Sequence, residues 1–175
     1  MKKRGREELK MIDRFFASLI NKLYYQYRQD NGLNFGSLEI EPVIRFGGFV
    51  LREPYWNYQE KRAEVKRGWH NREPLLKMGD IAVYTSTIYL NELFLCKQMG
   101  LQAFFESKEE FVKYFNTESL AEVITHELGH AILTDTQPKT QEINGGHGKE
   151  HDKVSGELLK LLKSFSEYEE LKKHW

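Results

Sequence analysis

The chain has 175 residues, enough for one domain with a substantial core, and its 40% hydrophobic and 30% charged residues exclude a disordered chain. Its 26 basic and 26 acidic residues cancel, so no overall field attracts nucleic acid. We therefore expect residues 1–175 to form one domain, with a basic and flexible start at residues 1–6.

From the N-terminal segment we expect no targeting signal. Residues 1–6 are basic, but no apolar run of the signal-peptide type follows them, and no stretch approaches membrane-spanning length. The single cysteine, Cys96, excludes an intramolecular disulfide and a cysteine-rich zinc site. We expect an intracellular, cytoplasmic protein with no membrane partner.

Periodic apolar residues predict a helix followed by a strand. Between residues 7 and 28, apolar side chains recur every three or four positions, as on one face of a helix: Leu9, Ile12, Phe16, Leu19, Ile20, Leu23 and Tyr27. Residues 38–46 alternate apolar and polar, which is typical of a half-buried strand, and Pro42 favours an edge or a bulge. Gly47 and Gly48 mark a bend after this strand.

The middle of the chain is predicted to be mostly irregular. In residues 52–79, prolines, glycines and charges interrupt any regular pattern. Residues 80–90 are rich in β-branched and aromatic side chains and predict a strand strongly. An extended substrate could pair with this strand if its edge is exposed, and the alternative is a core strand paired on both sides.

Helices are predicted for the remainder of the chain, before a partly helical tail: residues 91–99, 107–115, 119–133 and 147–163. Ser119 and Glu122, three residues apart, predict a capping box at the start of the third of these helices. The fold class is therefore α+β, with an N-terminal helix, a small and mostly antiparallel sheet, and C-terminal helices.

An H-E-x-x-H motif, His126-Glu127-Leu128-Gly129-His130, lies on this third helix. Residues four apart share one face of a helix, so His126 and His130 can bind one metal ion together. Glu127 can approach a water bound to that metal, which is the arrangement of zinc hydrolases. The alternative is a pair of surface histidines on an ordinary amphipathic helix.

A third ligand must come from elsewhere, because catalytic zinc usually takes three protein ligands and leaves the fourth position to water. The next candidates follow a polar loop, in the segment Gly145–His151. His147 lies between glycines that allow close backbone approach, and His151 lies one helical turn later. Glu150 and Glu157 are further candidates, since glutamate is also a zinc ligand.

Together, the segment HELGH and the later segment GGHGKEH resemble the SprT-like (Spartan-like) zinc metallopeptidases over residues 80–160. The resemblance implies one zinc ion per chain, bound by His126, His130 and His147, with Glu127 as the catalytic base. It also implies a zincin-like fold of the minigluzincin type. Many family members carry a cysteine-bearing zinc ribbon, which a chain with one cysteine lacks.

The implied activity is that of a zinc-dependent metalloendopeptidase acting on proteins or peptides, including proteins bound to DNA. A zinc-activated water would attack the peptide bond, with Glu127 as the general base. Tyr89, His151 and Tyr168 are candidates for stabilising the oxyanion. The alternative function is a zinc-binding adaptor or structural module without protease activity, in which a fourth protein ligand closes the site.

A stretch between residues 52 and 77 interleaves aromatic and basic side chains: Tyr55, Trp56, Tyr58, Lys61, Arg62, Lys66, Arg67, Trp69, Arg72 and Lys77. Such a combination suits single-stranded DNA. The alternative, favoured by the zero net charge, is a loop whose aromatic side chains pack onto the core. His70 and His174 lie in charged surroundings and are predicted to be surface residues.

Overall fold

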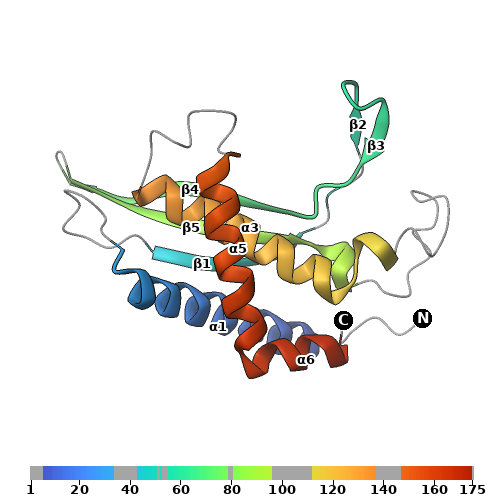
Figure 1. Cartoon of the computed structure of the whole chain (residues 1–175), viewed down its shortest axis with the longest axis horizontal. Helices are drawn as coiled ribbons and strands as arrows, with labels where there is room; N and C mark the ends of the chain where they lie inside the picture. Colours follow the sequence, from blue (N-terminus) through green and yellow to red (C-terminus); the bar gives the residue numbers. More distant parts are fainter. Residues whose placement is uncertain are drawn as a thin grey trace.

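A computed structural model describes residues 6–33, 43–50, 52, 55–78, 81–95, 112–136 and 147–174. Within these ranges the fold is α+β, as the sequence predicts, with an N-terminal helix, a three-stranded sheet and C-terminal helices (Figure 1). No helix in the described ranges is both long enough and apolar enough to cross a membrane.

The three-stranded sheet is mixed rather than mostly antiparallel. Its central strand is β5 (Ile81–Asn91), which pairs in parallel with β1 (Val43–Val50) and antiparallel with β4 (Gly68–Met78). Because β5 has a partner on each side, it is the doubly paired core strand, and its edge is closed to a substrate. Among the described strands, β4 is the edge strand that packs against α3.

β1 contains a bulge where the sequence predicts a bend. The register with β5 shifts between Phe46 and Gly48, so Gly47 is the extra residue. A Cβ atom at Gly47 would collide with the ring of Tyr89, which explains the glycine. The predicted strand begins earlier, but residues 38–42 lie outside the described ranges.

The segment predicted to be irregular contains three strands. β2 (Tyr55–Asn57) and β3 (Arg62–Glu64) form an antiparallel hairpin, and β4 follows directly. The side-chain Oδ1 of Asn57 accepts hydrogen bonds from the backbone N–H groups of Gln59 and Glu60, at 3.0 and 3.2 Å, which closes the turn. The hairpin projects from the body of the molecule (Figure 1). The prediction failed because these strands are stabilised by cross-strand pairing more than by local composition.

Helix α1 (Arg6–Asn31) confirms the prediction for residues 7–28. Its predicted apolar stripe is buried except at Leu9, which is 37% exposed. The next predicted helix is a short 3₁₀ turn, η1 (Glu92–Leu95), and its remaining residues, 96–99, lie outside the described ranges. Of the helix predicted over residues 107–115, residues 112–114 are helical and residues 107–111 are not described.

Helix α3 (Thr117–Thr136) carries the H-E-x-x-H motif and begins with a different cap from the predicted one. The side-chain Oδ1 of Asn116 accepts a hydrogen bond from the backbone N–H of Ser119 at 2.8 Å, as an N-cap residue does. Ser119 instead donates its hydroxyl to the carbonyl of Lys113 at 3.2 Å. Asparagine therefore takes the role that the sequence assigned to Ser119.

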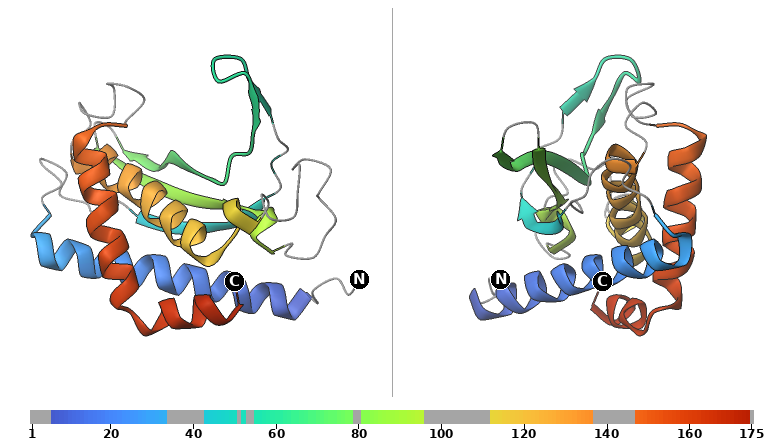
Figure 2. Two further views of the ribbon diagram at one scale, coloured as in Figure 1. Left: turned by 45° about the vertical axis from the view of Figure 1, so that its right-hand side comes forward. Right: turned by 90° about the vertical axis from the view of Figure 1, so that its left-hand side faces the viewer.

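Helix α3 lies at the centre of the molecule, packed against β4 and β5 on one side and α5 (Lys149–Ser164) on the other (Figure 2). Its predicted apolar residues are all buried: Leu120, Val123, Ile124, Leu128, Ala131 and Ile132. Helix α1 packs against β1 and α5, and α6 (Ser166–His174) follows α5. This burial on several sides holds the motif on a rigid support.

Candidate metal centre

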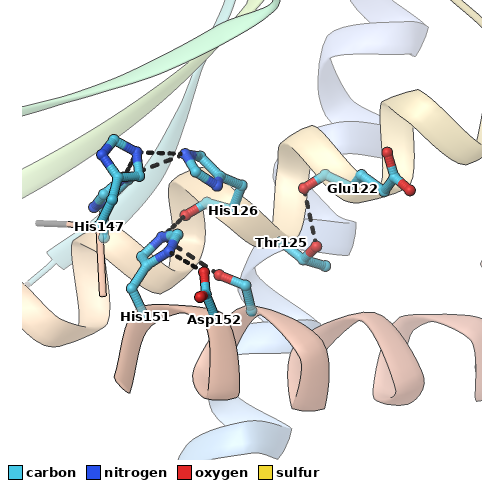
Figure 3. A network of polar contacts seen from close by, with 8 residues as sticks. Glu122, Thr125, His126, His147, His151 and Asp152 are labelled. Atoms are coloured by element: carbon cyan, nitrogen blue, oxygen red, sulfur yellow. Dashed lines mark hydrogen bonds and ion pairs between the residues drawn. The ribbon is translucent and has the colours of Figure 1, made fainter. Parts of the chain in front are cut away.

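Three histidine side chains from two separate segments converge above α3. His126 and His130 lie one turn apart on α3, and His147 lies just before Gly148, the N-cap residue of α5. Every pair among their three Nε2 atoms is separated by 3.2 Å. The nitrogen atoms therefore form an equilateral triangle (Figure 3 labels His126 and His147).

Hydrogen bonding alone does not account for this triangle. Each Nε2 atom of a neutral imidazole either carries a proton and donates or has a lone pair and accepts, so three Nε2 atoms cannot form hydrogen bonds in all three pairs. Three nitrogen atoms bound to a tetrahedral zinc ion at about 2.0–2.1 Å lie about 3.3 Å apart. The observed spacing of 3.2 Å fits three lone pairs directed at one metal ion.

A second grouping of histidines is looser. His126, His130 and His151 could also hold a metal ion, because their ligand atoms lie within 4.8 Å of one another. However, Nε2 of His151 lies 3.0 Å from the carbonyl oxygen of His126, so this nitrogen donates a hydrogen bond and is not free to bind a metal. Nε2 of His147 lies closer to the other two histidines, at 3.2 Å from Nε2 of His126 and of His130.

Glu127 lies beside the histidines and is 8% exposed. Burial raises the pKa of Glu127 to about 7, and the ammonium group of Lys66 opposes this shift only in part. A carboxyl group with this pKa can both accept and release a proton near neutral pH.

The environment also keeps His126 neutral, which is the form that binds a metal. Burial lowers the pKa of His126 to about 3, and the positive charges that His151, His130 and His147 can carry contribute further. A neutral imidazole keeps its lone pair available at ordinary pH.

An open cavity of about 480 Å³ lies over the three histidines. One wall is the start of β4, at Gly68, Trp69 and His70, and Glu127 lies on the α3 side. A Cβ atom at Gly68 would collide with Val123 and lie 3.2 Å from Cγ of Glu127, so glycine allows the strand to approach α3 closely.

His70 lines the cavity, so the prediction that it is a surface residue in charged surroundings is wrong. It is half-buried on β4, and burial, with a further effect of Arg72, lowers the pKa of His70 to about 4. Its ring lies parallel to that of His130 with 6.4 Å between centroids. Recognising β4 as a strand with Gly68 at its start would have placed this side chain against α3.

The other candidates lie elsewhere. Of the residues proposed for the oxyanion, Tyr89 stacks on Trp69, and the hydroxyl of Tyr168 donates to Glu118 at 2.7 Å. His151 is buried beneath the other histidines. The carboxylate of Glu157 accepts a hydrogen bond from Tyr27, which leaves it a poor candidate for the third ligand.

Glu150 and His174 are both exposed. Neither belongs to the cavity lining in the part of the chain that is described. The surface position predicted for His174 is therefore confirmed.

Comparisons with protein-family models, with curated proteins and with solved structures found no match to this chain. The resemblance to SprT-like metallopeptidases therefore rests on the two histidine segments of the sequence.

Proposed function

We propose that this protein is a zinc-dependent metalloendopeptidase of the SprT-like type, with a zincin-like active site. The observation that carries the proposal is the 3.2 Å triangle of Nε2 atoms beside a buried carboxylate and beneath an open cavity. His126, His130 and His147 would hold one zinc ion. In this position zinc would act as a Lewis acid and lower the pKa of water toward about 7.

Glu127 would be the general base. Glu127 lies on the same helix as two of the proposed ligands, and burial raises the pKa of its carboxyl group to about 7. It would accept a proton from the attacking water and pass it to the leaving amine. A purely structural zinc site does not need such a carboxylate, which favours the enzyme over a zinc-binding adaptor or structural module.

The substrate would be an extended segment of a protein or peptide. The support is the position of β4, whose first residues form a cavity wall and which is the edge strand next to α3. An extended chain can add to such an edge by backbone hydrogen bonds, with its scissile bond over the histidines.

Single-stranded DNA is a second proposed partner, through which the enzyme would reach DNA-bound proteins. Three aromatic side chains of the β2–β3 hairpin support it: Tyr55, Trp56 and Tyr58 are 51%, 53% and 83% exposed. Trp69 does not contribute, because it is buried, stacks on Tyr89 and lies beneath Arg52. The four aromatic residues between residues 52 and 77 thus divide into three exposed ones on the hairpin and one, Trp69, in the core.

The Glu127→Gln variant tests the peptidase. We expect it to keep the fold and the bound zinc but to lose hydrolysis of an unstructured protein by about 10²–10⁴-fold, since only the base is removed. Glu122→Gln is the matched control, because Glu122 is an exposed residue of the same helix. Wild-type turnover by Glu127→Gln would refute the mechanism, and zinc binding without hydrolysis by the wild type would favour the structural module.

A further inference from the structure

His151 is the one buried histidine of the cluster that the proposed mechanism leaves without a task. It lies on α5, four residues after His147, and is 2% exposed. Full burial of an imidazole is costly unless its nitrogen atoms are bonded or serve a purpose. The surroundings of His151 therefore indicate what it does.

Its hydrogen bond defines the protonation of the ring. Nε2 lies 3.0 Å from the carbonyl oxygen of His126, and a carbonyl can only accept, so the proton is on Nε2 (Figure 3). Nδ1 is buried, accepts no hydrogen bond from the residues that the structure describes, and lies 3.9 Å from the exposed carboxylate of Asp152. His151 thus contacts the backbone of a proposed ligand through its only N–H.

The ring also contacts the rings of both proposed ligands on α3. It stacks on His130 with 4.0 Å between centroids and an interplanar angle of 28°. It meets His126 edge to face, with 4.5 Å between centroids. Each α3 histidine is thereby limited in the rotations its side chain can make.

A glycine makes room for this contact. A Cβ atom at Gly129 would lie 2.6 Å from Oγ of Ser155 and 3.3 Å from Nε2 of His151. The glycine inside the H-E-x-x-H motif therefore allows α5 to approach α3 at the level of the two histidines. Ser155 also lies close to the ring, with its Oγ 3.4 Å from Nε2 of His151.

We propose that His151 is a positioning residue that holds His126 and His130 in the metal-binding arrangement, by its Nε2–H bond to the His126 carbonyl and by ring packing. The proposal rests on the zinc site proposed above but not on peptidase activity. The segment that leads into α5 then supplies a proposed metal ligand, His147, and α5 itself supplies, four residues later, the residue that orders the other two. Outer contacts of this kind commonly change metal affinity by about 10–100-fold.

Two variants separate the hydrogen bond from the ring. His151→Gln retains an N–H donor near the position of Nε2, whereas His151→Phe retains a ring but no donor. Zinc affinity, measured by competition with a chromogenic chelator, should fall by about 10–100-fold in His151→Phe and stay near the wild-type value in His151→Gln. Lys153→Ala is the control, since Lys153 is an exposed residue of the same helix.

The opposing outcomes are distinct. Wild-type affinity in His151→Phe, or equal losses in both variants, would overturn the role of the hydrogen bond. Loss of zinc from both, with full zinc in His147→Ala, would make His151 a ligand and overturn the proposal. The zinc-affinity experiment does not depend on hydrolysis. If the His151 variants change zinc affinity as expected but the wild type cleaves no peptide, only the proposed peptidase activity is refuted.

A measurement on the wild-type protein covers the case in which a variant fails to fold. Long-range ¹H–¹⁵N correlation spectra of the metal-free protein report the tautomer of each histidine ring. We expect His151 to carry its proton on Nε2, with slow exchange because the ring is buried. A proton on Nδ1 alone would overturn the proposal.

Discussion

The histidine cluster and the β2–β3 hairpin are held in opposite ways. The cluster lies between α3 and the start of α5. The centroid of the His151 ring is 4.0 Å from that of His130 and 4.5 Å from that of His126. The hairpin has two three-residue strands and presents three exposed aromatic side chains. Side chains on packed helices have few alternative positions, whereas side chains on a short exposed hairpin can adapt to a partner.

The hairpin is nevertheless anchored at its base. Asn91, fully buried at the end of β5, donates from its side-chain Nδ2 to the carbonyls of Arg52 at 3.2 Å and Lys66 at 2.8 Å. Its backbone N–H donates to the carbonyl of Arg67 at 2.8 Å. One residue thus joins both ends of the hairpin to the sheet that borders the cavity. The two regions therefore differ in the exposure of their side chains more than in the anchoring of their backbones.

The largest expected effect concerns the cluster. His147→Ala removes one of three converging nitrogen atoms and should weaken zinc binding by more than about 100-fold, since loss of a ligand exceeds loss of an outer contact. Metal analysis after dialysis measures this, with His174→Ala as the control because His174 is exposed. Full zinc occupancy in His147→Ala would show that the cluster uses another ligand.

The anchor of the hairpin should have the next largest effect. Asn91→Ala leaves the carbonyl groups of Arg52 and Lys66 without their side-chain donor and should lower the free energy of unfolding by about 1–3 kcal/mol. Thermal unfolding measures the loss, and protease cleavage within the hairpin should accelerate. Asn71→Ala is the control, because Asn71 is exposed on β4. If Asn91→Ala changes neither the thermal stability nor the rate of cleavage in the hairpin, Asn91 does not anchor the hairpin.

A third variant tests what the exposed hairpin binds. Trp56→Ala should weaken the binding of single-stranded DNA by about 1–3 kcal/mol if a base stacks on this ring. The affinity of the wild-type protein should fall steeply as the salt concentration rises. Fluorescence titration at low salt measures it, with Tyr25→Ala as the control because Tyr25 is a 54% exposed aromatic residue of α1. No binding by the wild-type protein would leave substrate choice to the cavity alone.

The smallest effect is expected far from both regions. Glu118 of α3 accepts hydrogen bonds from Lys163 and Tyr168, which lower the pKa of its carboxyl group. The stabilisation of the folded protein by the Glu118 carboxylate is present above the pKa of this group in the unfolded chain. It is lost as the pH falls through the lower pKa of the folded protein. Because the Glu118–Lys163 ion pair is exposed, its contribution to the free energy of unfolding should be below about 1 kcal/mol. Glu118→Gln should remove this part of the acid dependence in urea unfolding measured across pH, and an unchanged profile would exclude it.

Local signals explain the correct predictions. The apolar periodicity of α1, α3 and α5 and the four-residue spacing of His126 and His130 are properties of a single helix. These patterns do not depend on which segments meet. The helices and the presence of a histidine pair on one face of α3 were therefore predictable from the sequence.

Long-range packing explains the rest. Pairing with β5 makes β4 a strand despite its charged composition, and this brings His70 to the cavity. Asn116 is the cap because α3 begins at Thr117, about one turn earlier than the sequence predicts.

The sequence by itself determined that two histidines and a glutamate share one helix, because helical geometry fixes residues four apart on one face. Only the tertiary structure decided which histidine of the GGHGKEH segment turns its Nε2 atom toward the Nε2 atoms of that pair. His147 lies just before the N-cap of α5 and His151 lies on α5, four residues later, and the close approach at Gly129 commits Nε2 of His151 to the His126 carbonyl. That choice follows from the packing of two helices, which no local pattern encodes.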